Sequence, residues 1–391
     1  MKRWTPPAVH RHQSGGVTAE PERMAWHCCS ELVTVTCHEK CIPEFVEHDI
    51  AELYGSLYSS IPMLRAYDSL REPVNTCVMH HNGRLVAIFL VRVRAGILNV
   101  INEGMPLSDE QVHLFSDYAF ARHPDVGVIR FHSVHLENSI AIARPHQRYR
   151  CSENIVISLP ASVPAYHASL GKNTRRNLKR YGERLVRDFP SYQYEVLDGS
   201  EVDEQDVRAI ISLNIARMAS KSKVSAYDHA ETERLVGLVR RCGLVGIARI
   251  SGRVCAGALS FRSGDNFTLS VLAHDMAYND YSLGILCAYH IICDCIDRGA
   301  SEFHFLWGRY DYKFQLLGKE RPLENLSIYR SGFKLISHAD LFVRNQIDAL
   351  GNRIAERLHA IGKQRSAPAR LALRVLSSLR SAKRAINGQA R

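Results

Sequence analysis

Hydrophobic positions in the second half of the chain change their spacing in a regular order. Three runs with strand-like alternation, separated by turns that contain glycine, are at 244–250, 254–262 and 267–274. A polar loop at 279–284 precedes a segment whose apolar residues follow helical spacing as far as Ile296, and Gly299 marks the end of this helix. A short strand at 302–306 and a loop at 307–313, rich in titratable side chains, come next. The pattern predicts three antiparallel strands, a helix and a further strand.

The first half of the chain repeats this order. The hairpin segments at 82–87 and 251–256 share a turn, an arginine and an alanine, and they lie about 170 residues apart. A helix is predicted after the first hairpin, because Ser108 and Gln111 have the spacing of a capping box. The other elements expected in this half are strands at 32–36, 76–80, 85–94, 97–101, 126–131 and 154–159 and a helix at 43–58. We infer a duplication, and therefore an α/β fold with a mixed α+β sheet built from two similar units.

The ends of the chain differ from these two units in composition. Residues 1–23 are rich in proline, glycine, serine and charge, which predicts a disordered leader. After residue 332 we expect a helical extension. Its long amphipathic helix carries an apolar face that would pack on the domain or on a partner, formed by Ile347, Leu350, Ile354, Leu358 and Ile361. The predicted division is a leader at 1–23, units at 24–160 and 161–332, and an extension at 333–391.

Composition limits the class of protein. Of 391 residues, 46% are hydrophobic and 23% are charged, as in ordinary globular proteins with room for two cores. No apolar run approaches the ~20 residues of a membrane span, and the first residues lack the apolar stretch of a signal peptide, so we expect a cytoplasmic protein. The 11 cysteines show no spacing of the zinc or redox type, and we expect no metal site.

The net charge of +10 is concentrated in two segments. The first, 172–187, predicts a basic helix, which either is a solvated linker or binds phosphate through Arg175, Arg176 and Lys179. The second, 369–386, predicts a basic amphipathic helix, either a soluble tail or a segment that docks to an anionic membrane face. Docking would place the protein at the inner face of the cytoplasmic membrane. Charge alone suits an enzyme of anionic substrates and a nucleic-acid binder equally.

Two motifs in residues 166–330 resemble the GNAT-type acyltransferase superfamily. One is the basic helix at 170–180; the other is a Phe-x-x-Gly-x-x-x-Tyr-Lys pattern formed by Phe305, Gly308, Tyr312 and Lys313. The closer resemblance is to the acetyltransferase domain of bacterial cellulose- and exopolysaccharide-biosynthesis proteins. That branch is related to the Fem-type aminoacyl transferases, which are also built from two GNAT-like units. His304 occupies the position of the family's aspartate, so a role that needs a carboxylate there is in doubt.

The resemblance implies that acetyl-CoA or another acyl-CoA is the donor, used without a metal. The loop after the central strand would hold the donor pyrophosphate at a helix N-terminus, where free N–H groups and a partial positive charge attract anions. A backbone N–H of the central strand, at Leu272 or Ala273, would stabilise the developing oxyanion. The candidate donor-binding residues are therefore Leu272, Ala273, Tyr281, Ser282, Leu283, Gly284, Arg175, Arg176 and Lys179.

Acyl transfer also needs a base and an acid. The candidates in the second unit are His274, Asp275, His304, Tyr310, Asp311 and Lys313, and Tyr310 and Tyr312 are candidates for protonating the departing thiolate. His274 ends the central strand and either acts as the base or only caps the strand end. Lys313, at the family's motif lysine, could neutralise a donor phosphate, hold a carboxylated acceptor or polarise the carbonyl. The first unit should lack acyl-donor chemistry, because its corresponding loop at 102–107 contains an acidic residue and a proline.

These features predict a GNAT-family N-acetyltransferase that moves an acyl group to an amine or hydroxyl of a cell-envelope or polysaccharide precursor. One alternative is a Fem-type transferase that uses aminoacyl-tRNA, against which the modest charge excess argues. The other is a catalytically inactive accessory protein of an envelope-assembly complex, against which the retained loop at 308–313 argues. Apart from tRNA in the first alternative, we expect no nucleic-acid partner.

Overall fold

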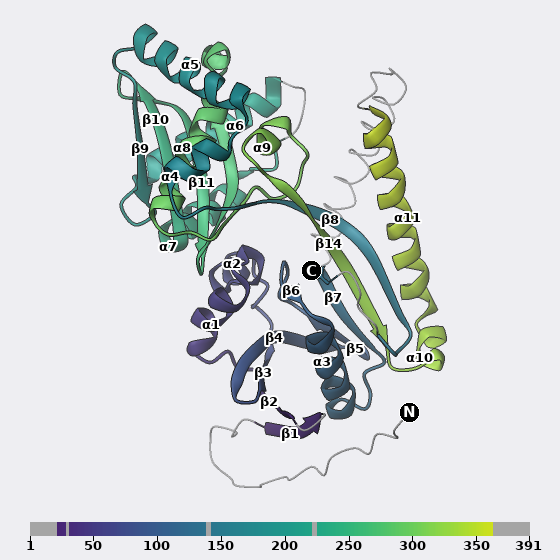
Figure 1. The fold of residues 1–391 in the computed structure, drawn as a ribbon. Coiled ribbons are helices and arrows are strands. Elements are labelled where there is room, and N and C mark those ends of the chain that lie inside the picture. The colour runs from purple at the N-terminus through teal and green to yellow at the C-terminus, as the bar shows by residue number, and fades with distance from the viewer. Residues whose placement is uncertain (1–21, 29–30, 138–141, 221–224, 363–391) are drawn as a thin grey trace.

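The strands of the computed structural model form one continuous mixed sheet (Figure 1). The structure describes residues 22–28, 31–137, 142–220 and 225–362. The strands are β1 (Glu22–Cys28), β2 (Glu31–His38), β3 (Asn75–His81), β4 (Arg84–Arg94), β5 (Ile97–Val100), β6 (Pro106–Leu107), β7 (Val128–Leu136), β8 (His146–Ser158), β9 (Gln193–Asp198), β10 (Gly243–Ile250), β11 (Arg253–Ser263), β12 (Asn266–His274), β13 (Glu302–His304) and β14 (Lys319–Tyr329). Their order in the sheet is β1-β2-β3-β4-β5-β7-β14-β8-β13-β12-β11-β10-β9, with β6 beside β7.

Helices cover both faces of this sheet. They are α1 (Phe45–Tyr54), α2 (Ile61–Ala66), α3 (Asp109–Arg122), α4 (Val163–Ser169), α5 (Lys172–Asp188), α6 (Glu204–Ser220), α7 (His229–Cys242), α8 (Leu283–Asp297), α9 (Asp311–Gln315), α10 (Gly332–Ser337) and α11 (Ala339–Gly362), with single 3₁₀ turns η1 (Leu57–Ser59) and η2 (Met276–Tyr281). No helix in the described ranges combines the length and the apolar content that crossing a bilayer requires.

The two halves of the sheet have the same order of elements. In the first half, β3, β4 and β5 are antiparallel neighbours, α3 follows, and β7 returns parallel to β5. In the second half, β10, β11 and β12 are antiparallel, α8 follows, and β13 returns parallel to β12. The predicted fold class, a mixed α/β sheet with two similar units, is therefore confirmed.

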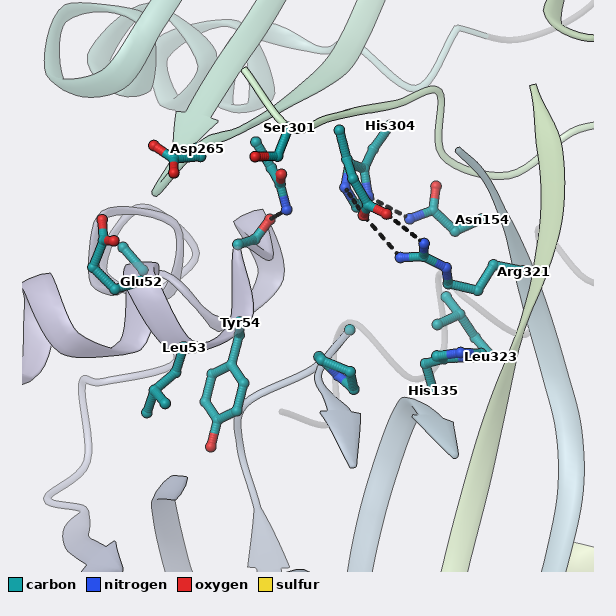
Figure 2. A pocket seen from close by; sticks show the side chains of 16 residues that line it. Glu52, Leu53, Tyr54, His135, Asn154, Asp265, Ser301, His304, Arg321 and Leu323 are labelled. Atoms are coloured by element: carbon teal, nitrogen blue, oxygen red, sulfur yellow. Dashed lines mark hydrogen bonds and ion pairs between the residues drawn. The ribbon is translucent and has the colours of Figure 1, made fainter. Parts of the chain in front are cut away.

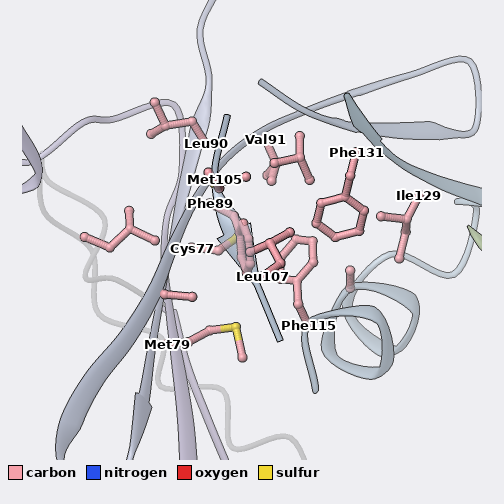
Figure 3. Close-up of a cluster of buried hydrophobic side chains, with 14 of the residues drawn as sticks. Cys77, Met79, Phe89, Leu90, Val91, Met105, Leu107, Phe115, Ile129 and Phe131 are labelled. Carbon is pink, nitrogen blue, oxygen red and sulfur yellow. The ribbon is translucent and has the colours of Figure 1, made fainter. Parts of the chain in front are cut away.

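The core of the first half contains a cluster of aromatic rings among aliphatic side chains (Figure 3). Phe115 of α3 lies against Phe89 of β4 and Phe131 of β7, with ring centroids 4.3 and 5.9 Å away. Helix α3 begins as the sequence predicts, because Ser108 and Gln111 form both hydrogen bonds of a capping box. This cap fixes the start of the helix and so the position from which Phe115 enters the core.

The second half buries both faces of its strands. On one face, α8 packs through apolar residues that include Leu286, Ile291 and Cys295, together with α4 and α5. On the other face, α6 and α7 pack over Val271 and Ala273. A bulge in β12 shifts the register near Ser270. As a result, Phe267 and Leu269 before the bulge face α8, whereas Val271 and Ala273 after it face α6 and α7.

One long strand from the end of the chain links the two halves. Strand β14 lies between β7 and β8, and its Leu326 and Ile328 are fully buried in the core of the first half. The division into units at 24–160 and 161–332 remains a prediction made from the sequence. In the structure, one sheet runs through both ranges.

The structure differs from the sequence expectations at several places. The helix expected at 43–58 ends at Gly55, which has the left-handed φ of +52° that stops a helix. Strand β1 starts at Glu22, inside the range expected as a leader. The predicted apolar face of α11 does not pack on the domain, since Ile347, Leu350 and Ile354 are 63%, 59% and 44% exposed. The side chains of Leu358 and Ile361 and the segment 369–386 lie outside what the structure describes.

Candidate active site

The parallel pair β12 and β13 separates after a short contact. Asn266–Thr268 pair with Glu302–His304. Beyond this point β12 continues to His274 paired with β11 on one edge, but it no longer pairs with β13 on the other. The chain after His304 stays with β8 instead, because Phe305 N–H donates to Ile155 O at 2.7 Å. A gap therefore opens along one edge of β12.

The backbone pattern of β12 decides which groups face this open edge. Asp275 N–H donates to Cys255 O on β11, and the register places Ala273 opposite Gly257. Because successive residues of a strand direct their N–H and C=O groups to opposite edges, Ala273 bonds toward β11 and Leu272 faces the gap. The Leu272 carbonyl accepts from Arg217 Nη2 at 3.3 Å, which agrees with that direction. Of the two predicted oxyanion donors, Leu272 is the one on the open edge.

The predicted donor loop lies at the N-terminus of α8. Ser282 has a left-handed φ of 54°, and its side chain does not cap the helix, which leaves the first N–H groups of α8 without a side-chain acceptor there. A Cβ on Gly284 would lie 3.2 Å from His274 Nδ1. His274 Nε2 is in turn 2.9 Å from Asn279 Oδ1. The structure therefore brings Ser282, Leu283, Gly284 and His274 together.

Helix α5 contacts this loop through its C-terminal half. The Arg184 guanidinium lies 4.7 Å from the Tyr281 ring centroid, and Tyr281 Oη donates to Asp188 Oδ2 at 3.1 Å. Arg184 is not among the phosphate-binding residues predicted from the sequence. The helical repeat places position 184 about 100° around the helix from the buried Leu185, so the apolar pattern of α5 does not mark it.

The three predicted phosphate-binding cations of α5 lie farther from the loop. Arg175 donates to Ala168 O at 2.7 Å, and Lys179 pairs with Glu183 at 3.8 Å. At 1.5 Å per residue, Lys179 and Arg175 lie about 8 and 14 Å from Arg184 along the helix axis. Arg176 and Lys179 are exposed, so they are accessible to a large anionic ligand more readily than to one confined at Gly284.

A cavity lies between the two halves, at the start of the parallel pair β12 and β13 (Figure 2). It has a volume of about 460 Å³, and an adjoining cavity of about 220 Å³ shares Gly104, Asn154, His304 and Leu323 with it. The end of α1 forms the opposite wall. That wall is tied to the second half because Asn266 Nδ2 donates to Gly55 O at 3.2 Å and Ser263 Oγ donates to Ser56 O at 3.3 Å.

Four polar side chains from three strands meet at this cavity. Arg321 of β14 forms a bidentate pair with Glu302 of β13, with distances of 2.9 and 2.6 Å. His304 Nε2 lies 3.2 Å from Glu302 Oε2, and Asn154 Nδ2 of β8 lies 2.8 Å from His304 Nδ1. Burial acts to raise the pKa of Glu302, but its contacts with His304 and Arg321 and their charge lower it to about 2. Glu302 is therefore a carboxylate at neutral pH.

This arrangement defines the tautomer of His304. The Glu302 carboxylate lies 3.2 Å from Nε2 without the alignment of a hydrogen bond, and its charge favours a proton on Nε2, so that Nδ1 keeps the lone pair that accepts from the Asn154 amide. The orientation of that amide is assigned from the same network. A histidine with one nitrogen held by a carboxylate and the other basic is the arrangement used for proton abstraction. The motif has an aspartate at the position of His304. In this chain the carboxylate is two residues earlier on the same face of β13, at Glu302.

Lys313 is buried and is used within its own loop. Its ammonium donates to the carbonyls of Phe305 at 2.8 Å, Leu306 at 3.4 Å and Trp307 at 2.6 Å. Burial lowers the pKa of Lys313 to about 8, while Glu153 acts in the opposite direction. Leu306 has a left-handed φ of 58°, which is costly for a branched side chain. Lys313 therefore stabilises the strained segment that supplies Leu306 and Trp307 to the smaller cavity.

The other predicted catalytic residues lie apart from the cavity array. Tyr310 is 61% exposed and stacks on Tyr312 with centroids 6.3 Å apart, and Asp311 is exposed at the start of α9. Burial raises the pKa of Tyr312 to about 12. His274 is six residues beyond Thr268 along β12, which places it about 20 Å from the cavity at ~3.3 Å per residue. His274 therefore belongs with the donor loop in space, and His304 with the cavity.

Among the charged side chains that line the two cavities, carboxylates outnumber basic groups. Glu52 and Asp265 line the larger cavity, and Glu103 and Glu153 line the smaller one. The one arginine of the described lining, Arg321, is paired with Glu302. In a chain of net charge +10, this local excess of carboxylates favours a cationic ligand. Among the described residues, no cluster of histidine, cysteine and carboxylate side chains suits a metal ion.

Comparison with known proteins finds similarity in the second half. Residues 172–314 match the family model described as acetyltransferase (GNAT) domain. The sequence matches no curated protein at a significant level. The structural neighbours include FemX, which has 10% sequence identity and a TM-score of 0.55 over 74% of this chain and 96% of the FemX chain. At that identity, the likeness to FemX supports the fold alone.

Two further neighbours are more distant. One is L-PGS from Bacillus licheniformis, with 10% identity and a TM-score of 0.42 over 66% of this chain and 85% of that chain. The other is a tandem GNAT protein from the clavulanic acid biosynthesis pathway, with 13% identity and a TM-score of 0.36 over 75% of this chain and 98% of that chain. The matched residues 172–314 contain α5, β12, the α8 loop, β13 and Lys313, and thus most of the site described above.

Proposed function

We propose that this chain uses its GNAT domain to transfer an acyl group from a coenzyme A thioester to an amine bound between its two halves. The observation that carries the proposal is the Glu302–His304–Asn154 array, which lines the cavity at the start of the β12–β13 pair. The basic nitrogen of His304 would serve as the base, and the open edge of β12 at Leu272, four residues or ~13 Å along the strand from Thr268, would supply the oxyanion donor that acyl transfer needs.

The residues at α8 fit the donor. Gly284 has no side chain, which leaves room for a pyrophosphate. The uncapped helix N-terminus and the nearby Arg184 supply positive potential there. Ser282, Leu283 and Gly284 would hold it with backbone N–H groups, and Tyr281 and His274 would flank it. The thioester, when bound, supplies an activated acyl carbonyl and a thiolate leaving group. Leu272 N–H, on the open edge of β12, would donate to the oxygen of that carbonyl.

The acceptor site is the cavity. Its carboxylates attract a protonated amine, which must lose a proton before it can act as a nucleophile. His304 Nδ1 would take this proton once the acceptor replaces the Asn154 amide there. Glu302 and Arg321 hold the imidazole in the required tautomer. Tyr310 and Tyr312 remain candidates for protonating the thiolate.

Lys313 acts in this proposal as a positioning residue. Its three carbonyl hydrogen bonds hold the segment at 305–307, which forms one side of the gap beside β12. The narrower hypothesis, that the acceptor is a cell-envelope or polysaccharide precursor, rests on the motif residues Phe305, Gly308, Tyr312 and Lys313 and on the basic helix α5.

A second candidate donor is aminoacyl-tRNA. The observation that favours it is the row of exposed cations on the N-terminal half of α5, among them Arg176, Lys179 and Arg180, which lies outside the donor loop. Such a row fits an extended polyanion better than a single pyrophosphate. The same row is compatible with a coenzyme A enzyme, since solvated cations are common on surface helices.

The experiment that tests the proposal is a thermal-shift titration with acetyl-CoA, longer acyl-CoAs, coenzyme A and aminoacyl-tRNA, followed by a thiol-release assay with a panel of amines and matched alcohols. A donor at 100 times its dissociation constant stabilises the native state by about 2.7 kcal/mol. We expect saturable stabilisation by an acyl-CoA and thiol release that depends on an amine. A shift with aminoacyl-tRNA alone would establish the second candidate, and no shift with any donor would refute transferase activity.

A further inference from the structure

Helices α10 and α11 each pack on the sheet through one side. Leu335 of α10 and Leu341 and Phe342 of α11 belong to one apolar cluster on β7 and β14. Farther along α11, the same inner side continues through the buried Asn345 and Ala349. These contacts define which side of each helix faces the protein, and the opposite sides face away from the sheet.

The sides that face away carry large apolar side chains. Six of them, each at least 44% exposed, form a set that we call the apolar ridge: Phe333, Ile336, Val343, Ile347, Leu350 and Ile354. At 100° per residue, the four ridge residues of α11 lie within about 60° of arc, on the side of the helix opposite Asn345. Figure 1 shows α11 at the edge of the molecule, outside β8 and β14. The ridge is therefore an outward apolar surface.

The sequence that follows α11 is strongly basic. Residues 363–391 contain eight lysines and arginines and no aspartate or glutamate, so they contribute +8 to the net charge of +10. The helices themselves add little charge, since Arg344 pairs with Asp340 at 3.6 Å. The basic segment is covalently joined to α11 at Gly362. A partner that meets the ridge therefore also meets this positive charge, which favours an anionic partner.

We propose that the apolar ridge inserts into the surface of an anionic lipid membrane, to which the charge of residues 363–391 attracts the protein. Exposed apolar side chains on a helix enter the boundary between headgroups and acyl chains. A small apolar anchor alone gives weak, reversible binding, and a polybasic segment beside it makes the binding stable on anionic lipids. The end of this chain combines these two features.

A second copy of the chain is the competing occupant of the ridge. A specific protein interface takes roughly 20–30 residues from each side, whereas the ridge offers six apolar side chains. Pairing two ridges would also bring two segments of charge +8 toward each other, and these segments repel. A lipid surface needs neither the larger area nor a complementary shape. The proposal goes beyond acyl transfer, since no ridge residue belongs to the donor loop or the cavities.

The test is sedimentation of the full-length chain with lipid vesicles. We expect binding to vesicles of equal parts phosphatidylglycerol and phosphatidylcholine, and much weaker binding to phosphatidylcholine alone. The double substitution Phe333→Ser/Ile347→Ser should lower the partition coefficient on the anionic vesicles at least ~10-fold, because two inserting side chains are lost. The matched control, Val93→Ser/Ile215→Ser, changes two exposed apolar residues elsewhere and should bind as the wild type does.

Three results of this experiment would overturn the proposal. They are no binding of the wild type, equal binding to both kinds of vesicle, and wild-type binding by the ridge variant, which would mean that charge alone holds the protein. Sedimentation equilibrium without lipid gives a fourth. A dimer that Ile347→Ser dissociates would assign the ridge to a second copy. All substitutions are at exposed positions, so the thermal transitions of the variants should match that of the wild type.

Tryptophan fluorescence measures insertion directly. Lipids brominated on their acyl chains quench a tryptophan that reaches the hydrocarbon. Ile347→Trp places the probe on the ridge, and Ile215→Trp is the control on α6. Both proteins keep the same native tryptophans, so the difference between them reports the new side chain. We expect several-fold stronger quenching of the added emission in Ile347→Trp, and equal quenching in the two variants would refute insertion of the ridge.

Discussion

At the scale of single residues, the cavity is organised by the partners of His304. The imidazole is buried between a carboxylate at one nitrogen and an amide at the other. Buried histidines with satisfied nitrogens are ordinary structural residues, but this one lines both cavities. Its basic nitrogen is bonded by an amide on a neighbouring strand, which an acceptor can replace more readily than a main-chain group.

Replacing His304 tests its role as the base. His304→Gln keeps a side-chain oxygen that can accept from Asn154 but removes the basic nitrogen, and we expect kcat/KM to fall by about 10²–10⁴. The measurement is thiol release at saturating acyl donor. His113→Gln, at an exposed position of α3, is the control and should retain full activity. Retention of activity by His304→Gln would assign the base to another residue.

The depressed pKa of Glu302 predicts a specific dependence of stability on pH. Its folded-state pKa is about 2, below the ordinary value of 4.5, so the pairing stabilises the protein above pH 4.5, and this contribution is lost as the pH falls from 4.5 to 2. The excess unfolding free energy of the wild type over Glu302→Gln should decrease across that range. Urea unfolding of both proteins between pH 6 and 3 measures it. A constant difference would contradict the pairing with Arg321.

How much of the site is visible in the sequence depends on the separation of its residues. The donor loop at 281–284 and the strand edge at Leu272 follow from local pattern and resemblance. His304 is visible as a departure from the family's aspartate. Asn154 and Arg321 carry no local signal, because they reach His304 and Glu302 only when β8 and β14 pair with their neighbours. Lys313 is predicted from its place in the motif, but its carbonyl partners become visible only in the folded loop.

At the scale of elements, the start of α8 combines an uncapped helix N-terminus with the predicted donor loop. The helix begins without a side-chain cap, and Gly284 lies against His274. An uncapped N-terminus is a cost to the helix unless a ligand or water satisfies its N–H groups. The local sequence thus sacrifices some helix stability to keep these groups available.

Gly284→Glu should weaken donor binding without unfolding the protein. It places a carboxylate at the N–H groups that would hold the pyrophosphate, and we expect the Kd for coenzyme A to rise at least ~10-fold. Isothermal titration calorimetry measures this change. Gly237→Glu is a matched control in α7, where an added Cβ meets nothing within 4 Å. Unaltered affinity in a folded Gly284→Glu protein would refute the assignment of the loop.

Elements with a strong internal period were predictable and those without one were not. The hairpins β3–β4 and β10–β11, the capping box of α3 and the basic helix α5 appear close to their expected ranges. Strand β14 was missed, since Lys-Glu-Arg-Pro at its start contains charge and a proline and resembles a loop. It becomes a strand because β7 and β8 offer it two edges. Tertiary pairing overrides local preference here.

At the scale of the whole molecule, the halves are interlocked. Beyond the shared sheet, Tyr67 of the first half donates a hydrogen bond to Glu231 of the second, and α2 packs on α7. The cavity lies between these ties and β14. Relative motion of the halves would therefore disturb the position of Arg321 of β14 relative to Glu302 and His304 of β13.

The interlocking predicts that the first unit is not stable alone. Residues 1–160 lack β14, and with it the fully buried Leu326 and Ile328. We expect this fragment to show no cooperative thermal transition. The same fragment joined by a Gly/Ser linker to residues 317–332 should recover one. Circular dichroism and calorimetry compare the two, and cooperative unfolding of the shorter fragment at the temperature of the full chain would contradict the prediction.

The position of β14 also affects how the protein is made. During synthesis at about 5–20 residues per second, the ribosome completes β14 roughly 10–40 s after β7, because 193 residues separate their ends, Leu136 and Tyr329. Throughout this interval the edge of β7 that β14 will occupy stays open, and an open strand edge is a template for intermolecular pairing. The nascent chain therefore has a defined period of aggregation risk, which ends only after residues 172–314, the range that the family model matches, have emerged.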